Sequence, residues 1–287
     1  MKDSPTTPDT ESSGWLDTHP KAKWLATSRT TGYFSAAVVV LVVVLVTIIV
    51  IRGRGEDTPT ATPPSIPEAT STTTAPQPDP GSVGGFGPSI ADPFGREISV
   101  PANEQGQVLP QTDPGERPAF TTGTPVPAPQ GIKWERIGAT VAPFSTSDGP
   151  THIEGRLAYG FTRTPQGAAL AGWQITARML RGIEDTREAY AKQIVADPGR
   201  AERALAALDR TDPAKSATGK ALVFPDAFQV TSYSGTTAIV RYATPLSSGR
   251  WMQGQATLEW SDQMWKLRDT PPPATTQIST LNGWTRW

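Results

Sequence analysis

The chain has 287 residues, a formal net charge of −1 and no cysteine. The near-neutral charge argues against a strongly basic nucleic-acid binder, so we expect no direct contact with nucleic acid. The missing cysteines exclude disulfides, thiolate zinc sites, iron–sulfur clusters and cysteine nucleophiles. The only two histidines are His19 and His152, which leaves little for metal or triad chemistry.

Residues 33–51 are the most hydrophobic stretch of the chain and predict a transmembrane helix. No charged residue lies between Arg29 and Arg52. As a helix this uncharged stretch measures about 33 Å, enough to cross a hydrocarbon core of about 30 Å. A cleavable signal peptide would need a shorter leader and small residues at its end, whereas RGRGED follows here. We therefore expect a single-pass signal-anchor in the cell membrane, in contact with lipid.

The charges that flank this stretch predict the orientation of the chain. The N-terminal side carries Lys2, Lys21, Lys23 and Arg29, and the other side has only two basic residues close to the span. Lysine and arginine collect on the cytoplasmic side of a membrane. Residues 1–32 are thus expected to be a disordered cytoplasmic tail, and the C-terminal part to be extracytoplasmic.

Composition divides the rest of the chain in two. Residues 52–130 are rich in Pro, Thr and Gly, and 16 of the 29 prolines lie between residues 56 and 130. Such a sequence buries too little apolar surface to offset the entropy of ordering, which predicts a disordered linker. Residues 131–287 hold seven of the nine tryptophans and are expected to form one folded domain.

The first half of that domain predicts one strand and three helices. Residues 153–161 are expected to be a strand. Thr164 and Pro165 predict the cap and first residue of a helix that Gly182 ends. A capping box formed by Asp185 and Glu188 predicts a second helix through about residue 196, and Asp197-Pro198 predicts the start of a third.

From Phe224 the hydrophobic period changes to two, which is typical of strands. Alternating segments at residues 228–233, 238–242, 251–260 and 264–268 are separated by turn residues such as Ser234-Gly235. Helices followed by hairpins in series predict an α+β domain with a curved antiparallel sheet.

The sequence predicts no catalytic, cofactor-binding or metal-ligating residue. His152 lies in a polar stretch and is expected at a loop or strand edge. A segment ending in Gly219-Lys220 is no phosphate loop, because Ala214 and Ala221 stand where Gly and Ser or Thr are required. The sequence places no partner group beside the carboxylates of the sheet region, so none of them is predicted to act as a general acid or base. These carboxylates are Asp226, Glu259, Asp262 and Asp269.

The tryptophans of the domain fall into two groups. Trp173, Trp251, Trp260 and Trp265 occupy apolar phases of their elements and are expected in the core, although a ligand cleft lined by them is a second interpretation. After the prolines at 271–273 come Trp284 and Trp287, which either fold back onto the domain or contact another protein.

The order of segments resembles a known class of membrane protein. A membrane helix and a Pro-rich stalk precede APFSTSDGP, GFTRTPQGAALAGWQITAR, TLEWSDQMWKL and a final STLNGWTRW. This is similar to single-pass membrane proteins of actinobacterial integrative and conjugative elements. The helices and curved sheet also resemble the nuclear-transport-factor-2-like cone, which the membrane scaffold of type IV secretion systems uses outside the membrane.

These resemblances imply a non-enzymatic scaffold or accessory subunit of a conjugation or type IV secretion apparatus. Its partners would be other membrane proteins of the transfer complex, and a homo-oligomer stays open. A small-ligand, lipid-binding or enzymatic pocket in the cone is the alternative, and an inward Asp–Tyr or Asp–His pair would favour it. A protein that binds wall polymer is a third hypothesis.

Overall fold

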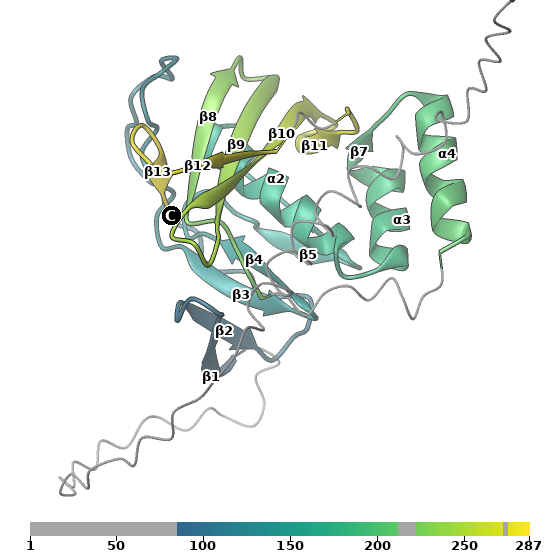
Figure 1. Ribbon diagram of the computed structural model, residues 1–287, viewed down its shortest axis with the longest axis horizontal. Coiled ribbons are helices and arrows are strands. Elements are labelled where there is room, and N and C mark those ends of the chain that lie inside the picture. Colours follow the sequence, from purple (N-terminus) through teal and green to yellow (C-terminus); the bar gives the residue numbers. More distant parts are fainter. Residues whose placement is uncertain (1–84, 212–221, 272–274) are drawn as a thin grey trace, which may run out of the picture. The chain divides into compact units, whose positions relative to one another are not determined.

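The computed structural model describes residues 85–211, 222–271 and 275–287 (Figure 1). The expected tail and membrane span, within residues 1–51, and the rejected phosphate loop at 214–221 lie outside the described residues. The described residues form three helices, which are α2 (Pro165–Met179), α3 (Ile183–Lys192) and α4 (Pro198–Asp209). Their strands are β1 (Phe86–Ala91), β2 (Glu97–Pro101), β3 (Lys133–Ile137), β4 (Thr140–Phe144), β5 (His152–Glu154), β6 (Leu157–Tyr159), β7 (Ile194–Val195), β8 (Ala227–Tyr233), β9 (Thr237–Pro245), β10 (Trp251–Ser261), β11 (Met264–Arg268), β12 (Thr276–Ile278) and β13 (Thr285–Arg286). No helix in these ranges is both long and apolar enough for a membrane crossing.

Two larger sheets and a small hairpin make up the β structure of the described ranges. One sheet has the order β1-β2-β3-β4, and the other has the order β13-β8-β9-β10-β11-β7 with β12 paired to β10. Strands β5 and β6 form the separate hairpin. Helix α2 contacts strands of all three sheets, and the antiparallel sheet β8–β11 follows the helices along the chain. The α+β class is confirmed, although six strands also precede the helices.

The N-terminal boundary predicted for the domain is wrong. Strands β1 and β2 lie inside residues 52–130, and β2 pairs in parallel with β3 through Ser99 and Glu135. Folded structure therefore begins by residue 86 and not at 131. The prolines are compatible with these strands because Pro101 ends β2, and Pro88 lies on an edge strand where the ladder shifts register.

The segment between β2 and β3, residues 102–132, has no helix or strand but is held against the domain; we call it the strap. The Thr112 amide donates to the Thr146 carbonyl over 2.6 Å. The Val126 carbonyl accepts a 2.6 Å bond from the Thr285 hydroxyl, and the side chain of Val126 is buried in the main core. The strap is thus an integral part of the fold despite its composition.

Helix α2 begins where its sequence signals predict. The Thr164 hydroxyl accepts a 3.0 Å bond from the amide of Gly167, and Pro165 is the first helical residue. Almost all of α2 is buried, including the small residues from Ala168 to Gly172. Small side chains allow the helix backbone to lie close to the strands.

Two local predictions in this region are wrong. The strand predicted at residues 153–161 is instead the hairpin β5–β6 at residues 152–159, because Gly155 turns the chain with a φ of +58°. Helix α3 starts after Gly182 and ends at Lys192, so Asp185 lies in its first turn instead of at its cap. The Asp185 carboxylate instead pairs with Arg156 and Arg181. The third helix begins at Pro198, as expected.

The meander of the second sheet matches its period-two pattern. Strands β8, β9, β10 and β11 pair antiparallel in sequence order. Asp262 and Gln263 both have positive φ in the tight turn between β10 and β11. The parallel pairing of β7 with β11 was not predicted, because β7 has only two residues.

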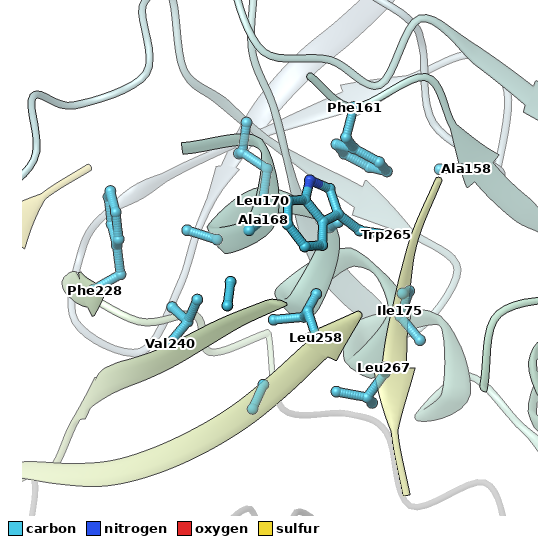
Figure 2. Close-up of a cluster of buried hydrophobic side chains, with 14 of the residues drawn as sticks. Ala158, Phe161, Ala168, Leu170, Ile175, Phe228, Val240, Leu258, Trp265 and Leu267 are labelled. Atoms are coloured by element: carbon cyan, nitrogen blue, oxygen red, sulfur yellow. The ribbon is translucent and has the colours of Figure 1, made fainter. Parts of the chain in front are cut away.

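The main core lies where α2 meets the second sheet (Figure 2). Trp265 is 1% exposed, and its indole N–H donates to the Thr162 carbonyl over 2.9 Å. Leu170 of α2 and Leu258 of β10 are fully buried in the same cluster. Trp173 is partly buried and packs against all three hydrophobic clusters of the described residues, so it links them.

Candidate functional site

The residues singled out in the sequence do not converge on one site. His152 is exposed on β5, where its Nδ1 lies 3.1 Å from the Thr151 hydroxyl and its ring stacks on Tyr159. The four carboxylates are held in separate ion pairs. These pairs are Asp226 with Arg96, Glu259 with Arg268, Asp262 with Lys266 and Asp269 with Arg200. Among the described residues, no group of three or more acids and histidines could hold a metal ion.

One of these carboxylates meets a tyrosine. The Tyr190 hydroxyl donates to Asp269 over 3.0 Å, and the Arg200 Nε lies 2.8 Å from the same carboxylate. The side chain of Asp269 is 2% exposed. Burial of the Tyr190 hydroxyl, and then the negative charge of Asp269, raises the pKa of Tyr190. These contacts join α3 and α4 to the end of β11, so we interpret the group as a structural tie.

The tryptophans are mainly structural. Trp265 is buried, whereas Trp251 and Trp260 are half-buried on β10. Trp287 folds back onto the domain, with its ring centroid 4.4 Å from Phe228 and 5.5 Å from Trp134. Trp284 is half-buried in the turn that precedes β13.

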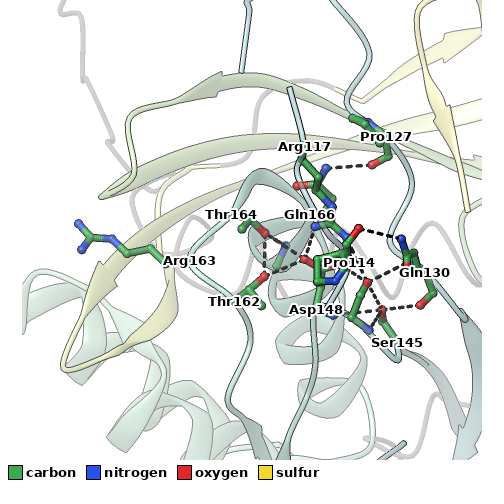
Figure 3. A network of polar contacts seen from close by, with 12 residues as sticks. Pro114, Arg117, Pro127, Gln130, Ser145, Asp148, Thr162, Arg163, Thr164 and Gln166 are labelled. Atoms are coloured by element: carbon green, nitrogen blue, oxygen red, sulfur yellow. Dashed lines mark hydrogen bonds and ion pairs between the residues drawn. The ribbon is translucent and has the colours of Figure 1, made fainter. Parts of the chain in front are cut away.

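A polar network centres on Asp148, a residue that sequence reasoning missed (Figure 3). This residue lies in the loop between β4 and β5, and its side chain is fully buried. Both carboxylate oxygens accept bonds from Arg117 of the strap, over 2.7 and 2.8 Å. The hydroxyls of Thr162 and Thr164 donate to the same carboxylate over 2.8 and 3.1 Å.

The network fixes the strap to the start of α2. Burial by itself raises the pKa of Asp148, but the bonds from Arg117, Ser147 and Thr162 outweigh it and hold the pKa below the usual range. Thr164 both bonds Asp148 and caps α2, so the ion pair and the helix start depend on each other. With all its partners supplied by the protein itself, Asp148 is a stabilising group and not a free acid.

A second buried carboxylate lacks such support. Glu135 on β3 is fully buried, and its Oε2 accepts a 2.7 Å bond from the amide of Gln107 in the strap. No donor within the described ranges bonds its Oε1. Burial raises the pKa of Glu135 to about 8, against the opposing effects of the Gln107 amide, Lys133 and Arg178.

Arg178 of α2 is buried near Glu135 and is also held by neutral groups. Its guanidinium donates to Gln174 Oε1 and to the carbonyls of Arg156 and Gln105 over 2.8–3.0 Å. Burial, then repulsion by Arg181, lowers the pKa of this guanidinium. Arg178 therefore supports the strap at Gln105, and nothing in its contacts indicates a substrate site.

A cavity of about 480 Å³ opens between the N-terminal end of α3 and the C-terminal end of α4. Its charged lining is already paired, since Arg156 and Arg181 share Asp185, and Arg187 contacts Glu184 and Asp209. The positive end of α3 and the negative end of α4 also face each other there. The cavity thus offers polar contacts of both signs and no selective charge.

Comparison with known proteins gives one match. Residues 99–286 match a protein family described as a domain of unknown function (DUF8175). No curated protein and no solved structure shows a significant match.

We expect Asp148→Asn to destabilise the domain by about 3 kcal/mol at neutral pH, because it leaves the Arg117 guanidinium without its counter-charge. The lowered pKa of Asp148 means that its contribution is present above pH 3.8 and is lost as the pH falls through the folded-state pKa. Urea denaturation followed by tryptophan fluorescence measures both effects. Asp262→Asn, which removes an exposed ion pair, is the control and should cost less than about 1 kcal/mol. Equal losses in the two variants would contradict the role of Asp148.

We expect Glu135→Gln to stabilise the domain, whereas Asp148→Asn destabilises it. Between pH 4.5 and about 8 the folded state keeps a proton on Glu135 that the unfolded state releases, so this group lowers stability as the pH rises. The slope is at most about 1.4 kcal/mol per pH unit. Glu135→Gln should therefore be more stable than the parent at pH 8 and flatten the slope, whereas the exposed control Glu97→Gln should not. An unchanged slope in Glu135→Gln would show that burial does not govern this carboxyl.

Proposed function

The chain belongs to the DUF8175 family, because the family match covers more than half of the chain. For this member of the family we propose the role of a membrane-anchored, non-enzymatic scaffold or accessory subunit of a conjugation or type IV secretion apparatus. The proposal places the anchor at residues 33–51, the N-terminus in the cytoplasm and the folded domain outside. Its stalk shortens to residues 52–84, since the described fold begins at residue 85.

The observation that carries the proposal is the filled interior of the domain. A pocket enzyme or lipid carrier with this topology would keep the face of its sheet open around an inward polar pair. Here α2 covers that face of the second sheet, and the hydroxyl of the inward Tyr242 donates to the Ala169 carbonyl over 2.8 Å. The space in which a ligand would sit is filled by Leu170, Leu258 and Trp265.

The likeness to a nuclear-transport-factor-2-like cone is part of the proposal. Its support is the order of elements, with helices first and then the antiparallel strands β8 to β11, and the packing of α2 against those strands. The β1-β2-β3-β4 sheet and the strap are additions that such a cone does not require. They enlarge the surface that the domain can offer to partner proteins.

The alternative function, binding of a small ligand, has one observation in its favour. The cavity between α3 and α4 is large enough for a metabolite. Its balanced charges favour a zwitterionic or neutral polar compound over an anion. Because this cavity lies outside the filled core, a ligand there would act beside a scaffold role instead of replacing it.

A clean deletion of the gene tests the proposed function. We expect transfer of the element that carries it to fall at least tenfold, because a subunit of the machinery is lost, and expression in trans to restore transfer. Crosslinked membranes of the complemented strain should yield transfer proteins together with the chain.

An alkaline phosphatase fused after Gly84 should be active in the same cells, since the proposal places this point outside the membrane. Normal transfer in the deletion strain would refute the role in conjugation. An inactive phosphatase fusion, together with an active fusion of a cytoplasmic reporter at the same point, would refute the orientation.

A further inference from the structure

The hairpin β1–β2 covers an apolar surface that is built by other parts of the chain. Trp134 of β3, Val141 of β4 and Phe224 form this surface, which we call the aromatic shelf. The rings of Trp134 and Phe224 stack with their centroids 4.3 Å apart. Ile98 of β2 packs onto the shelf and is fully buried there.

An arginine of the same hairpin fixes it to the shelf. The Arg96 guanidinium lies 3.6 Å from the centre of the Phe224 ring and donates to the Phe224 carbonyl over 2.8 Å. It also pairs with Asp226, just before β8, and with Asp92 of its own hairpin. Arg96 and Ile98, two residues apart, thus both hold the hairpin to the shelf.

The backbone pairing that joins the hairpin to the rest of its sheet is short. Strand β2 pairs with β3 at a single position, Ser99 with Glu135, whereas β3 and β4 pair over five positions. Strand β1 is the outer edge of this sheet (Figure 1). If the hairpin left, the edge of β3 and the aromatic shelf would open together.

The family match distinguishes the hairpin, which covers the shelf, from the shelf itself. It begins at Ser99, so Arg96, Ile98 and all of β1 precede it. The three shelf residues lie inside it. The shelf and the edge of β3 therefore belong to the shared domain, and most of the cover does not.

We infer that the edge of β3 and the aromatic shelf form a strand-binding groove, which the hairpin fills in cis and an extended segment of a partner protein fills in trans. The cis occupant defines the chemistry of that segment. It pairs with β3 through its backbone, packs an aliphatic side chain against Trp134, Val141 and Phe224, and carries an arginine two residues earlier for Asp226. Strand addition of this kind draws affinity from the backbone and specificity from alternate side chains.

The hairpin sets the strength of partner binding by competition. The apparent affinity of the groove equals its intrinsic affinity multiplied by the fraction of molecules in which the hairpin has left. A change that weakens the hairpin without altering the shelf must therefore tighten partner binding. The inference rests on the proposed function, since it gives the scaffold its contact surface.

The test measures binding of a fluorescent peptide with the sequence of residues 92–101 to the full-length chain in detergent, by anisotropy. We expect Arg96→Ala in the protein to bind the peptide at least tenfold more tightly than the parent, because the hairpin is loosened and the groove is intact. The same peptide with Ile98→Asp should not bind. Arg268→Ala, which removes an exposed ion pair on β11, is the matched control and should bind like the parent.

Hydrogen exchange in β1 and β2 shows whether the hairpin has loosened. Faster exchange in Arg96→Ala without tighter peptide binding would overturn the groove. If Arg96→Ala fails to fold or shows the same hydrogen exchange as the parent, the variant Ile98→Ala is used instead. Unchanged exchange in Ile98→Ala would refute the claim that the hairpin can be displaced. If the deletion strain loses transfer but the peptide does not bind the protein, the groove is refuted and the proposed function is not. If the peptide binds but the deletion strain transfers normally, the conjugation role is refuted and the groove is not.

Discussion

The close approach of α2 to the second sheet is the constraint on which the rest of the domain depends. A Cβ atom at Gly172 would lie 2.4 Å from the hydroxyl of Tyr242 and 3.2 Å from Leu258. The hydroxyl of Tyr242 reaches the backbone of α2 at Ala169, so strand and helix meet through one buried hydrogen bond. Because α2 also contacts β4 and β6, its depth sets the position of the elements on its other side.

The polar contacts of the strap follow from this arrangement. Thr164 begins α2 and bonds Asp148, which holds Arg117 of the strap. Further along α2, Arg178 donates to the carbonyl of Gln105. A proline-rich segment with few buried side chains is thus ordered by bonds to a helix that is itself fixed by the core. The same arrangement leaves the buried carboxylate of Glu135 incompletely hydrogen-bonded, because the strap that covers it supplies a single amide donor.

How far the sequence predicts the structure depends on the range of the interaction. Local signals such as the cap at Thr164 and the alternation through β8 to β11 placed elements correctly, because both ends of each interaction lie close in the chain. The pair of Arg117 with Asp148 joins residues 31 positions apart and leaves no periodic signal. Asp185 resembled a helix cap, but its pairing with Arg156 and Arg181 determines its place.

The N-terminal hairpin shows a second limit. The high proline content of residues 52–130 concealed β1 and β2, because composition averages over a long segment whereas strand pairing needs only a few residues. The shelf under the hairpin combines residues from β3, β4 and the start of the second sheet, and no local pattern reports such a surface. For the same reason the absence of a catalytic motif left the function open, and the filled interior became informative only in three dimensions.

The stability of Gly172→Ala tests the central constraint most directly. Helix propensity alone predicts that alanine stabilises the middle of a helix by about 1 kcal/mol relative to glycine. The close approach predicts the reverse, a loss of about 1–3 kcal/mol from overpacking against Tyr242 and Leu258, with part of the loss recovered when Tyr242→Phe removes the hydroxyl. Urea denaturation of the two variants and their double mutant measures these terms. A Gly172→Ala protein more stable than its parent would show that α2 does not lie at the depth that the rest of this account requires.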